Sequence, residues 1–150
     1  MINTDFFIDT PERSEAPSAK IFVKALSSSR ADLDSKPYVF IFPGGPGANH
    51  SHYENYDCLA PYGNIVFCDP RGCGLSSKAD PSTYTIENYI KDVEIVRQHL
   101  GLKEIVVLGK SCGAIAALGF TLKYPSIVSK LILSAGLQVI NFWKQQKQMF

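Results

Sequence analysis

The sequence predicts an α/β fold, with a mostly parallel, doubly wound sheet that starts from an antiparallel hairpin. Short, almost continuously apolar segments rich in Val, Ile and Phe recur along the chain, as in strands covered on both faces. Segments with apolar residues at helical spacing separate the last three of them. This alternation of strand and helix is typical of α/β folds, whose right-handed crossovers place helices on both faces of the sheet.

The strands are expected in two groups. Residues 5–10 and 20–26 flank a polar, proline-containing stretch, which favours an antiparallel hairpin. The apolar strands are expected at 38–42, 65–68, 105–108 and 131–133. Because parallel strands end at a common edge, functional residues are expected directly after these strands.

Two helices are expected between the last three strands. The first is capped by Thr85 and ends at Gly101. The second runs from about Cys112 to Tyr124 and stops before Pro125. It is apolar around most of its circumference, so we expect it to be buried.

The chain of 150 residues has the length and composition of one globular domain. We expect residues 1–136 to form the N-terminal part of an α/β core and residues 137–150 to begin a cap helix, since apolar residues share one helical face there. The sheet is then incomplete at its C-terminal side. Its uncovered edge strand favours self-association of a chain this short.

Composition argues against several partners. A formal net charge of +1 gives no general attraction to nucleic acid or to an anionic membrane. Early acidic residues are unlike a secretory signal, and no apolar run is long enough to span a bilayer. The four cysteines form no CxxC pair, so we expect a cytoplasmic protein with reduced thiols, no metal and no cofactor.

The segment GKSCG at residues 109–113 fits the pattern G-x-S-x-G. It follows a predicted strand and opens a predicted helix, where a sharp turn would project the Ser111 hydroxyl as a nucleophile. Gly109 and Gly113 would let strand and helix approach closely. The alternative is a tight turn with serine as a helix cap. A phosphate-binding loop is rejected, because Glu104 stands where that loop needs glycine.

A second glycine-rich segment, PGGPG at residues 43–47, follows the third predicted strand. In a hydrolase such a loop supplies one backbone N–H of the oxyanion hole, and the residue after the nucleophile supplies the other. We therefore expect Gly45 and Cys112 to be the donors. The supporting residues of the loop are Gly44, Pro46 and Gly47. A turn selected only for its shape is the alternative.

These two segments flank a third: the order is PGGPG at 43–47, DPRGCGLS at 69–76 and GKSCG at 109–113. Together they resemble the proline iminopeptidase (prolyl aminopeptidase) branch of the α/β-hydrolase superfamily, whose first two motifs read HGGPG and DQRGxGxS. The resemblance covers roughly residues 20–136 and implies the N-terminal half of an α/β-hydrolase fold. It also implies that the segment containing Asp69 and Arg71 organises a loop behind the oxyanion hole.

Two departures from the family pattern lie in the expected active site. Pro43 replaces the family's His, which changes how the loop is braced but keeps its backbone donors. Lys110 and Cys112 replace Gly and Trp, which alters the pocket and leaves proline specificity open. Lys110 either contacts a substrate carboxylate or, as we favour, stays solvated. We expect Cys112 to fill space and to act through its backbone N–H.

A general base is missing from the predicted site. The catalytic order in this fold is Ser, then Asp or Glu, then His, but no Asp, Glu or His follows Ser111. We expect His50 and His52 to be solvated loop residues and His99 to lie on a helix surface. The HxH pair lacks a third ligand and is a poor metal site.

The resemblance implies a serine hydrolase acting by acyl transfer, with Ser111 as the catalytic nucleophile. It favours a proline iminopeptidase-like aminopeptidase that releases an N-terminal residue from a small peptide, amide or ester substrate. A downstream Asp and His would complete the enzyme, so this chain alone is expected to be inactive. Two alternatives stay open: an esterase-type hydrolase with a different cap, and a non-catalytic shortened or degenerate protein.

Overall fold

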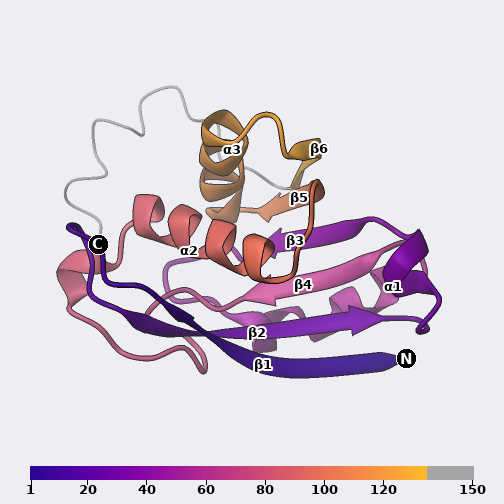
Figure 1. The fold of residues 1–150 in the computed structure, drawn as a ribbon, viewed down its shortest axis with the longest axis horizontal. Coiled ribbons are helices and arrows are strands. Elements are labelled where there is room, and N and C mark those ends of the chain that lie inside the picture. The colour runs from indigo at the N-terminus through magenta and orange to yellow at the C-terminus, as the bar shows by residue number, and fades with distance from the viewer. Residues whose placement is uncertain (135–150) are drawn as a thin grey trace.

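A six-stranded sheet forms the centre of the structure (Figure 1). The computed structural model describes residues 1–134. The strands are β1 (Ile2–Thr10), β2 (Ala19–Ser27), β3 (Tyr38–Phe42), β4 (Asn64–Cys68), β5 (Ile105–Lys110) and β6 (Val128–Ser134). Their spatial order is β1-β2-β4-β3-β5-β6, with β2 antiparallel to both of its neighbours and β4, β3, β5 and β6 parallel to one another. The predicted hairpin and mostly parallel sheet are confirmed.

The two predicted helices connect β4, β5 and β6. Helix α2 spans Ile86–His99 and α3 spans Gly113–Lys123. The Thr85 hydroxyl caps α2 by accepting the N–H of Asn88 at 3.1 Å, and Gly101, with φ 67°, follows its C-terminal end. The predicted start and stop of this helix are therefore confirmed.

Both helices pack on the same face of the sheet (Figure 1), around a core that includes Val93, Val107 and Phe120. The other face is covered by the 3-10 segment η1 (His50–Leu59), whose Tyr53 joins a second core cluster with Phe67. From β3 the chain moves to β4 on one side of β3 in the sheet, and it then crosses to β5 and β6 on the other side of β3. Crossovers of a single hand therefore place η1 opposite α2 and α3.

Three helical segments were not predicted: η1, the short helix α1 (Asp32–Ser35) and the 3-10 turn η2 (Pro81–Thr83). None of them carries an extended apolar periodicity. Residues 135–150 lie outside the described residues, and so does the cap helix expected at 137–150. No helix within residues 1–134 is long and apolar enough to cross a membrane.

A buried ion-pair network fastens α2 to the loop after β4. The Arg71 guanidinium donates to both Asp92 carboxylate oxygens, at 2.7 and 2.9 Å, and these side chains are only 2% and 1% exposed. Arg13, in the connection between β1 and β2, donates to the same carboxylate at 2.8 Å. Arg71 also donates to the carbonyl of Pro17 at 2.6 Å. One carboxylate thus holds three separate segments together.

Asp92→Asn is expected to lower the free energy of unfolding by about 3–5 kcal/mol, because two guanidinium groups lose their buried carboxylate. Asp9→Asn is the control, since it removes an exposed partner 4.0 Å from Lys20 and should change stability by less than about 0.5 kcal/mol. Urea unfolding followed by circular dichroism measures both. Equal, small losses in the two variants would contradict the role of the network.

Candidate functional site

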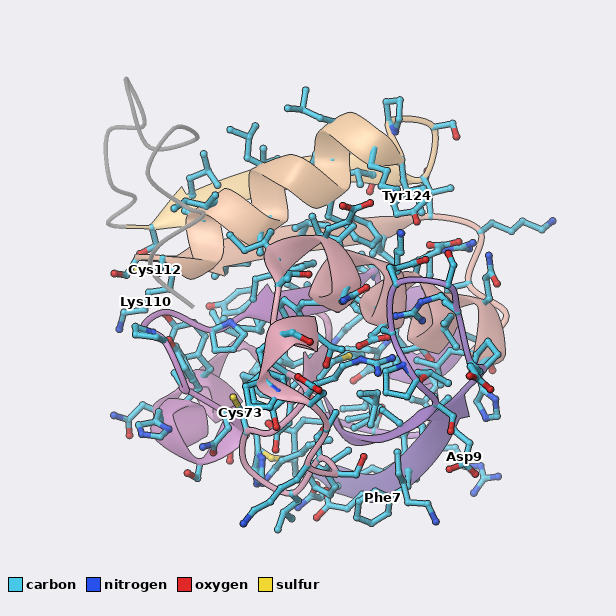
Figure 2. All side chains as sticks on the ribbon, turned by 90° about the vertical axis from the view of Figure 1, so that its left-hand side faces the viewer. Phe7, Asp9, Cys73, Lys110, Cys112 and Tyr124 are labelled. Atoms are coloured by element: carbon cyan, nitrogen blue, oxygen red, sulfur yellow. The ribbon has the colours of Figure 1, made fainter. Side chains whose placement is uncertain are left out.

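The three motif segments meet at one edge of the sheet. Segment 43–47 follows β3, segment 69–76 follows β4, and segment 109–113 joins the end of β5 to α3. Figure 2 looks onto this edge, where the labelled Cys73, Lys110 and Cys112 lie. Since β4, β3 and β5 are parallel neighbours in the sheet, their carboxyl ends bring the three segments side by side.

Ser111 has a strained backbone. Its φ of 52° makes it the single non-glycine residue with positive φ within residues 1–134. A left-handed conformation costs a residue with a side chain roughly 1–2 kcal/mol, and such strain occurs mainly at functional positions. The Ser111 N–H donates to the Ser134 carbonyl at 3.0 Å, and its own carbonyl accepts the Ala114 N–H at 3.0 Å. The turn therefore leaves the sheet and enters α3 directly.

Gly109 and Gly113 permit two close approaches of α3. A Cβ on Gly109 would lie 2.6 Å from both the Ala114 Cα and the Ala117 Cβ. A Cβ on Gly113 would overlap the carbonyl oxygens of Phe42 and Pro43 at the end of β3. The helix start is thus pressed against β5 and β3 at once, and a side chain at either position would separate them.

The loop 43–47 touches the Ser111 turn. A Cβ on Gly44 would lie 2.6 Å from the Lys110 carbonyl oxygen and 2.9 Å from the Ser111 Cβ. The two prolines of the loop have no N–H, and the Gly44 N–H donates to the hydroxyl of Tyr53. The loop N–H groups that remain for a ligand belong to Gly45 and Gly47, which have φ values of 74° and 86°.

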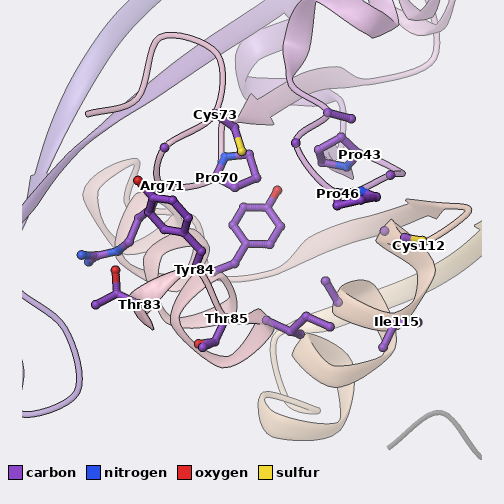
Figure 3. Close-up of a pocket in the computed structure, with 18 residues that line it drawn as sticks. Pro43, Pro46, Pro70, Arg71, Cys73, Thr83, Tyr84, Thr85, Cys112 and Ile115 are labelled. Atoms are coloured by element: carbon purple, nitrogen blue, oxygen red, sulfur yellow. The ribbon is translucent and has the colours of Figure 1, made fainter. Parts of the chain in front are cut away.

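A cavity of about 720 Å³ opens beside this loop (Figure 3). Pro43, Pro46, Cys112 and Ile115 lie on one side of it, and Pro70, Cys73 and Tyr84 face them. The lining residues are Pro43, Gly45, Pro46, Gly47, Ala48, Pro70, Arg71, Gly72, Cys73, Thr83, Tyr84, Thr85, Ile86, Tyr89, Cys112, Gly113, Ile115 and Ala116. Both expected oxyanion donors therefore border the cavity, whereas Ser111 is not among its lining residues.

Asp69 is a structural acceptor at the end of β4. Its carboxylate accepts the His50 backbone N–H at 2.8 Å and the Leu75 N–H at 3.0 Å, and it bonds the His50 ring Nδ1 at 2.8 Å. A Cβ on Gly74 would overlap this carboxylate. Asp69 therefore ties loop 69–76 to the start of η1.

The prediction of a solvated His50 is wrong. Its side chain is 17% exposed, and its ring lies against Phe22, with the ring centroids 4.6 Å apart. The bond to Asp69 explains the burial, because it draws the ring toward a carboxylate that is itself only 1% exposed. His52 and His99 are exposed, as expected. Within residues 1–134, no group of three or more His, Cys, Asp or Glu residues is placed to hold a metal ion.

Lys110 is held by aromatic rings and is only partly exposed. Its Nζ lies 5.6 Å from the ring centroid of Tyr53 and 5.8 Å from that of Tyr56. Such cation–π contacts favour this position for the ammonium group. Lys110 is thus only partly solvated, since its ammonium group also lies near two aromatic rings, and no sequence pattern had marked Tyr53 or Tyr56 as its neighbours.

The four cysteines are free thiols. Burial, with Asp69 and Asp92 nearby, raises the pKa of the Cys68 thiol well above its usual value. Burial and Asp69 also raise the pKa of Cys73. Both groups therefore favour the neutral thiol. Cys112 is partly exposed at the start of α3, where its backbone N–H opens the helix.

Comparisons with known proteins agree on one family. Residues 37–150 match the family described as the α/β hydrolase fold. The chain is 36% identical over 120 residues to a proline iminopeptidase of Lactobacillus helveticus, covering 77% of this chain and 41% of that protein. It is 37% identical over 116 residues to that of Lactobacillus crispatus, covering 74% and 40%. The chain thus spans about 40% of the length of these relatives.

A solved structure supports the same likeness. The proline iminopeptidase-related protein of Thermus thermophilus superposes with a TM-score of 0.69 and 25% sequence identity. The match covers 89% of this chain and 45% of that one. The resemblance stated from the three motif segments is therefore confirmed.

Gly113→Ala is expected to lower the free energy of unfolding by about 1–3 kcal/mol, because its methyl group meets rigid backbone at the end of β3. Gly119→Ala in the same helix is the control. There the new Cβ would lie 2.8 Å from the flexible end of the Ile90 side chain, and helix propensity contributes up to about 1 kcal/mol in its favour. Thermal and urea unfolding measure both variants. A Gly113→Ala protein as stable as Gly119→Ala would contradict the close approach.

Proposed function

The chain belongs to the α/β-hydrolase fold family, and from this membership we propose that it carries the nucleophile and the oxyanion hole of a serine hydrolase. One observation carries the proposal: Ser111 is the residue at which a strained turn joins β5 to α3. The fold alone does not require this strain, since a glycine at position 111 would adopt φ 52° at no steric cost. Its retention at a serine is understandable if the turn serves to project the hydroxyl.

The oxyanion hole of this proposal uses the N–H groups of Gly45 and Cys112. The other N–H near the turn, that of Gly44, is occupied by Tyr53. Cys112 is the N-cap of α3, so the N-terminal end of that helix also favours negative charge at this point. In the reaction, Ser111 Oγ attacks the substrate carbonyl and forms its C–O bond, and the resulting oxyanion accepts both hydrogen bonds. Departure of the amine or alcohol then leaves an acyl-enzyme, which water hydrolyses.

The proton of Ser111 requires a general base. No Asp, Glu or His follows Ser111 in the sequence, and the His50 ring is engaged by Asp69. A His and its acidic partner outside these 150 residues would therefore have to complete the triad. We expect the isolated chain to be inactive for this reason.

The proposed substrate class is a small peptide with an N-terminal proline, as for the proline iminopeptidases that the chain resembles. The cavity supports an apolar group beside the oxyanion donors, because Pro46, Tyr84, Ile86 and Ile115 are among its lining residues. An esterase-type substrate is the alternative. It stays open because Lys110 and Cys112, on either side of Ser111, differ from the residues that the family's peptidases carry there.

Fluorophosphonate labelling tests the nucleophile. The full-length protein is expected to be labelled covalently, and Ser111→Ala is expected to abolish the label, because the attacking oxygen is gone. Ser126→Ala, an exposed serine after α3, is the matched control and should label like the wild type. Intact mass and peptide mapping locate the adduct. An adduct that persists in Ser111→Ala would refute the assignment.

Proline 4-nitroanilide and 4-nitrophenyl butyrate separate the two substrate classes. For a proline iminopeptidase-like enzyme, we expect kcat/KM for the anilide to exceed that for alanine 4-nitroanilide by about 10-fold or more, which corresponds to about 1.4 kcal/mol of transition-state binding. Ser111→Ala measures the background of each reaction. Ester hydrolysis without hydrolysis of either anilide would instead support the esterase class.

A further inference from the structure

We propose that Tyr53 is a positioning residue that holds the oxyanion loop 43–47 in its reactive geometry. The inference rests on the proposed hydrolase function and adds to it a residue outside the three motif segments. Tyr53 lies in η1, on the face of the sheet opposite α3, and its side chain reaches the end of β3 from there.

The hydroxyl of Tyr53 accepts the Gly44 N–H, and this bond fixes the peptide plane immediately before Gly44. The next peptide plane carries the Gly45 N–H, the proposed oxyanion donor. Gly44 has no side chain to restrict its φ and ψ, so the direction of the Gly45 N–H depends on how firmly the preceding plane is held. The ring of Pro43 fixes the φ of that residue, but Pro43 has no N–H that could hold the loop by a hydrogen bond.

The bond also lies close to the reacting serine. The position that a Gly44 Cβ would take is 2.9 Å from the Ser111 Cβ and 3.3 Å from the Tyr53 hydroxyl oxygen. A small rotation at Gly44 would therefore change the position of the oxyanion donors relative to the substrate carbon that Ser111 attacks. Oxyanion donors are effective only when they are preorganised at hydrogen-bond distance from the developing charge.

The ring of Tyr53 is itself held from three sides. The residue is 5% exposed, and its ring centroid lies 5.2 Å from that of Tyr56 and 6.3 Å from that of Phe67 in β4. The Lys110 ammonium group lies 5.6 Å from the same ring. Tyr53 thus connects the sheet, the serine turn and the loop, and its hydroxyl is placed by packing that a phenylalanine ring would preserve.

Tyr53→Phe tests the proposal because it removes the hydroxyl alone. Tyr56→Phe is the matched control: Tyr56 lies in the same segment and under the same ammonium group, but does not bond to Gly44. Both are measured in the full-length protein with its preferred substrate. Active sites are counted by fluorophosphonate titration, so that any loss of folded protein does not enter kcat.

We expect Tyr53→Phe to lower kcat per active site by roughly 10- to 100-fold, less than the full loss of one donor, with KM changed by less than about 3-fold. Inhibition by a boronic acid, which mimics the tetrahedral intermediate, should weaken by the same factor as kcat/KM. Binding of a product-like competitor should stay within about 3-fold. A merely structural role would weaken both inhibitors alike or leave both unchanged.

Three outcomes are decisive. A selective loss in Tyr53→Phe, with Tyr56→Phe near the wild type, supports the proposal. An active, labelled wild type with equal effects of the two variants overturns the role of Tyr53 and leaves the proposed function intact. A wild type that neither labels at Ser111 nor turns over any substrate overturns the proposed function, and the positioning role with it.

Discussion

The contact between the start of α3 and the end of β3 sets how closely the Ser111 turn and loop 43–47 can approach each other. Gly113 allows the helix backbone to meet the carbonyl groups of Phe42 and Pro43 without an intervening side chain. Because β3 lies between β4 and β5, this contact brings loop 43–47 against the Ser111 turn. A side chain at Gly113 would push the two segments apart.

Hydrogen bonds and ion pairs of two buried carboxylates hold the segments around that contact. Asp69 and Asp92 are both buried, and each is surrounded by hydrogen-bond donors, as buried polar groups require. Asp92 fixes α2 through Arg71, and Asp69 fixes η1 through His50. Loop 69–76 is bonded through Asp69 to η1 and through Arg71 to Asp92, so the side of the cavity that it forms is held in place.

The sequence was sufficient for the features that depend on local patterns. The strands, the Thr85 cap and the order of the three motif segments could all be inferred from apolar runs, capping residues and glycines. The structure extends β1 and β6 beyond the predicted bounds, to Ile2 and to Val128, because strand ends follow their pairing partners and not their own hydropathy.

What could not be inferred depends on contacts between distant residues. The bond between His50 and Asp69 joins the segments that follow β3 and β4, and the bond between Tyr53 and Gly44 requires η1 to cover the second face of the sheet. Neither leaves a periodic signal in the chain. Pro43 shows the same limit: the sequence indicated that the loop had lost its family's histidine, but the phenol that takes the Gly44 N–H appears only in three dimensions.

The strand order also bears on how a nascent chain acquires this edge. The hairpin β1–β2 is local, but β2 needs β4 as its other partner, and β3 is enclosed only when β5 has been synthesised. Parallel neighbours of this kind are joined by long crossovers, so their pairing is slow and depends on late segments. During translation the glycine-rich loop would therefore emerge well before the serine turn that gives it a counterpart. A ribosome-bound chain ending before β5 could pair β3 with β4 but would leave the other edge of β3 unpaired, and such an exposed strand edge is prone to aggregation.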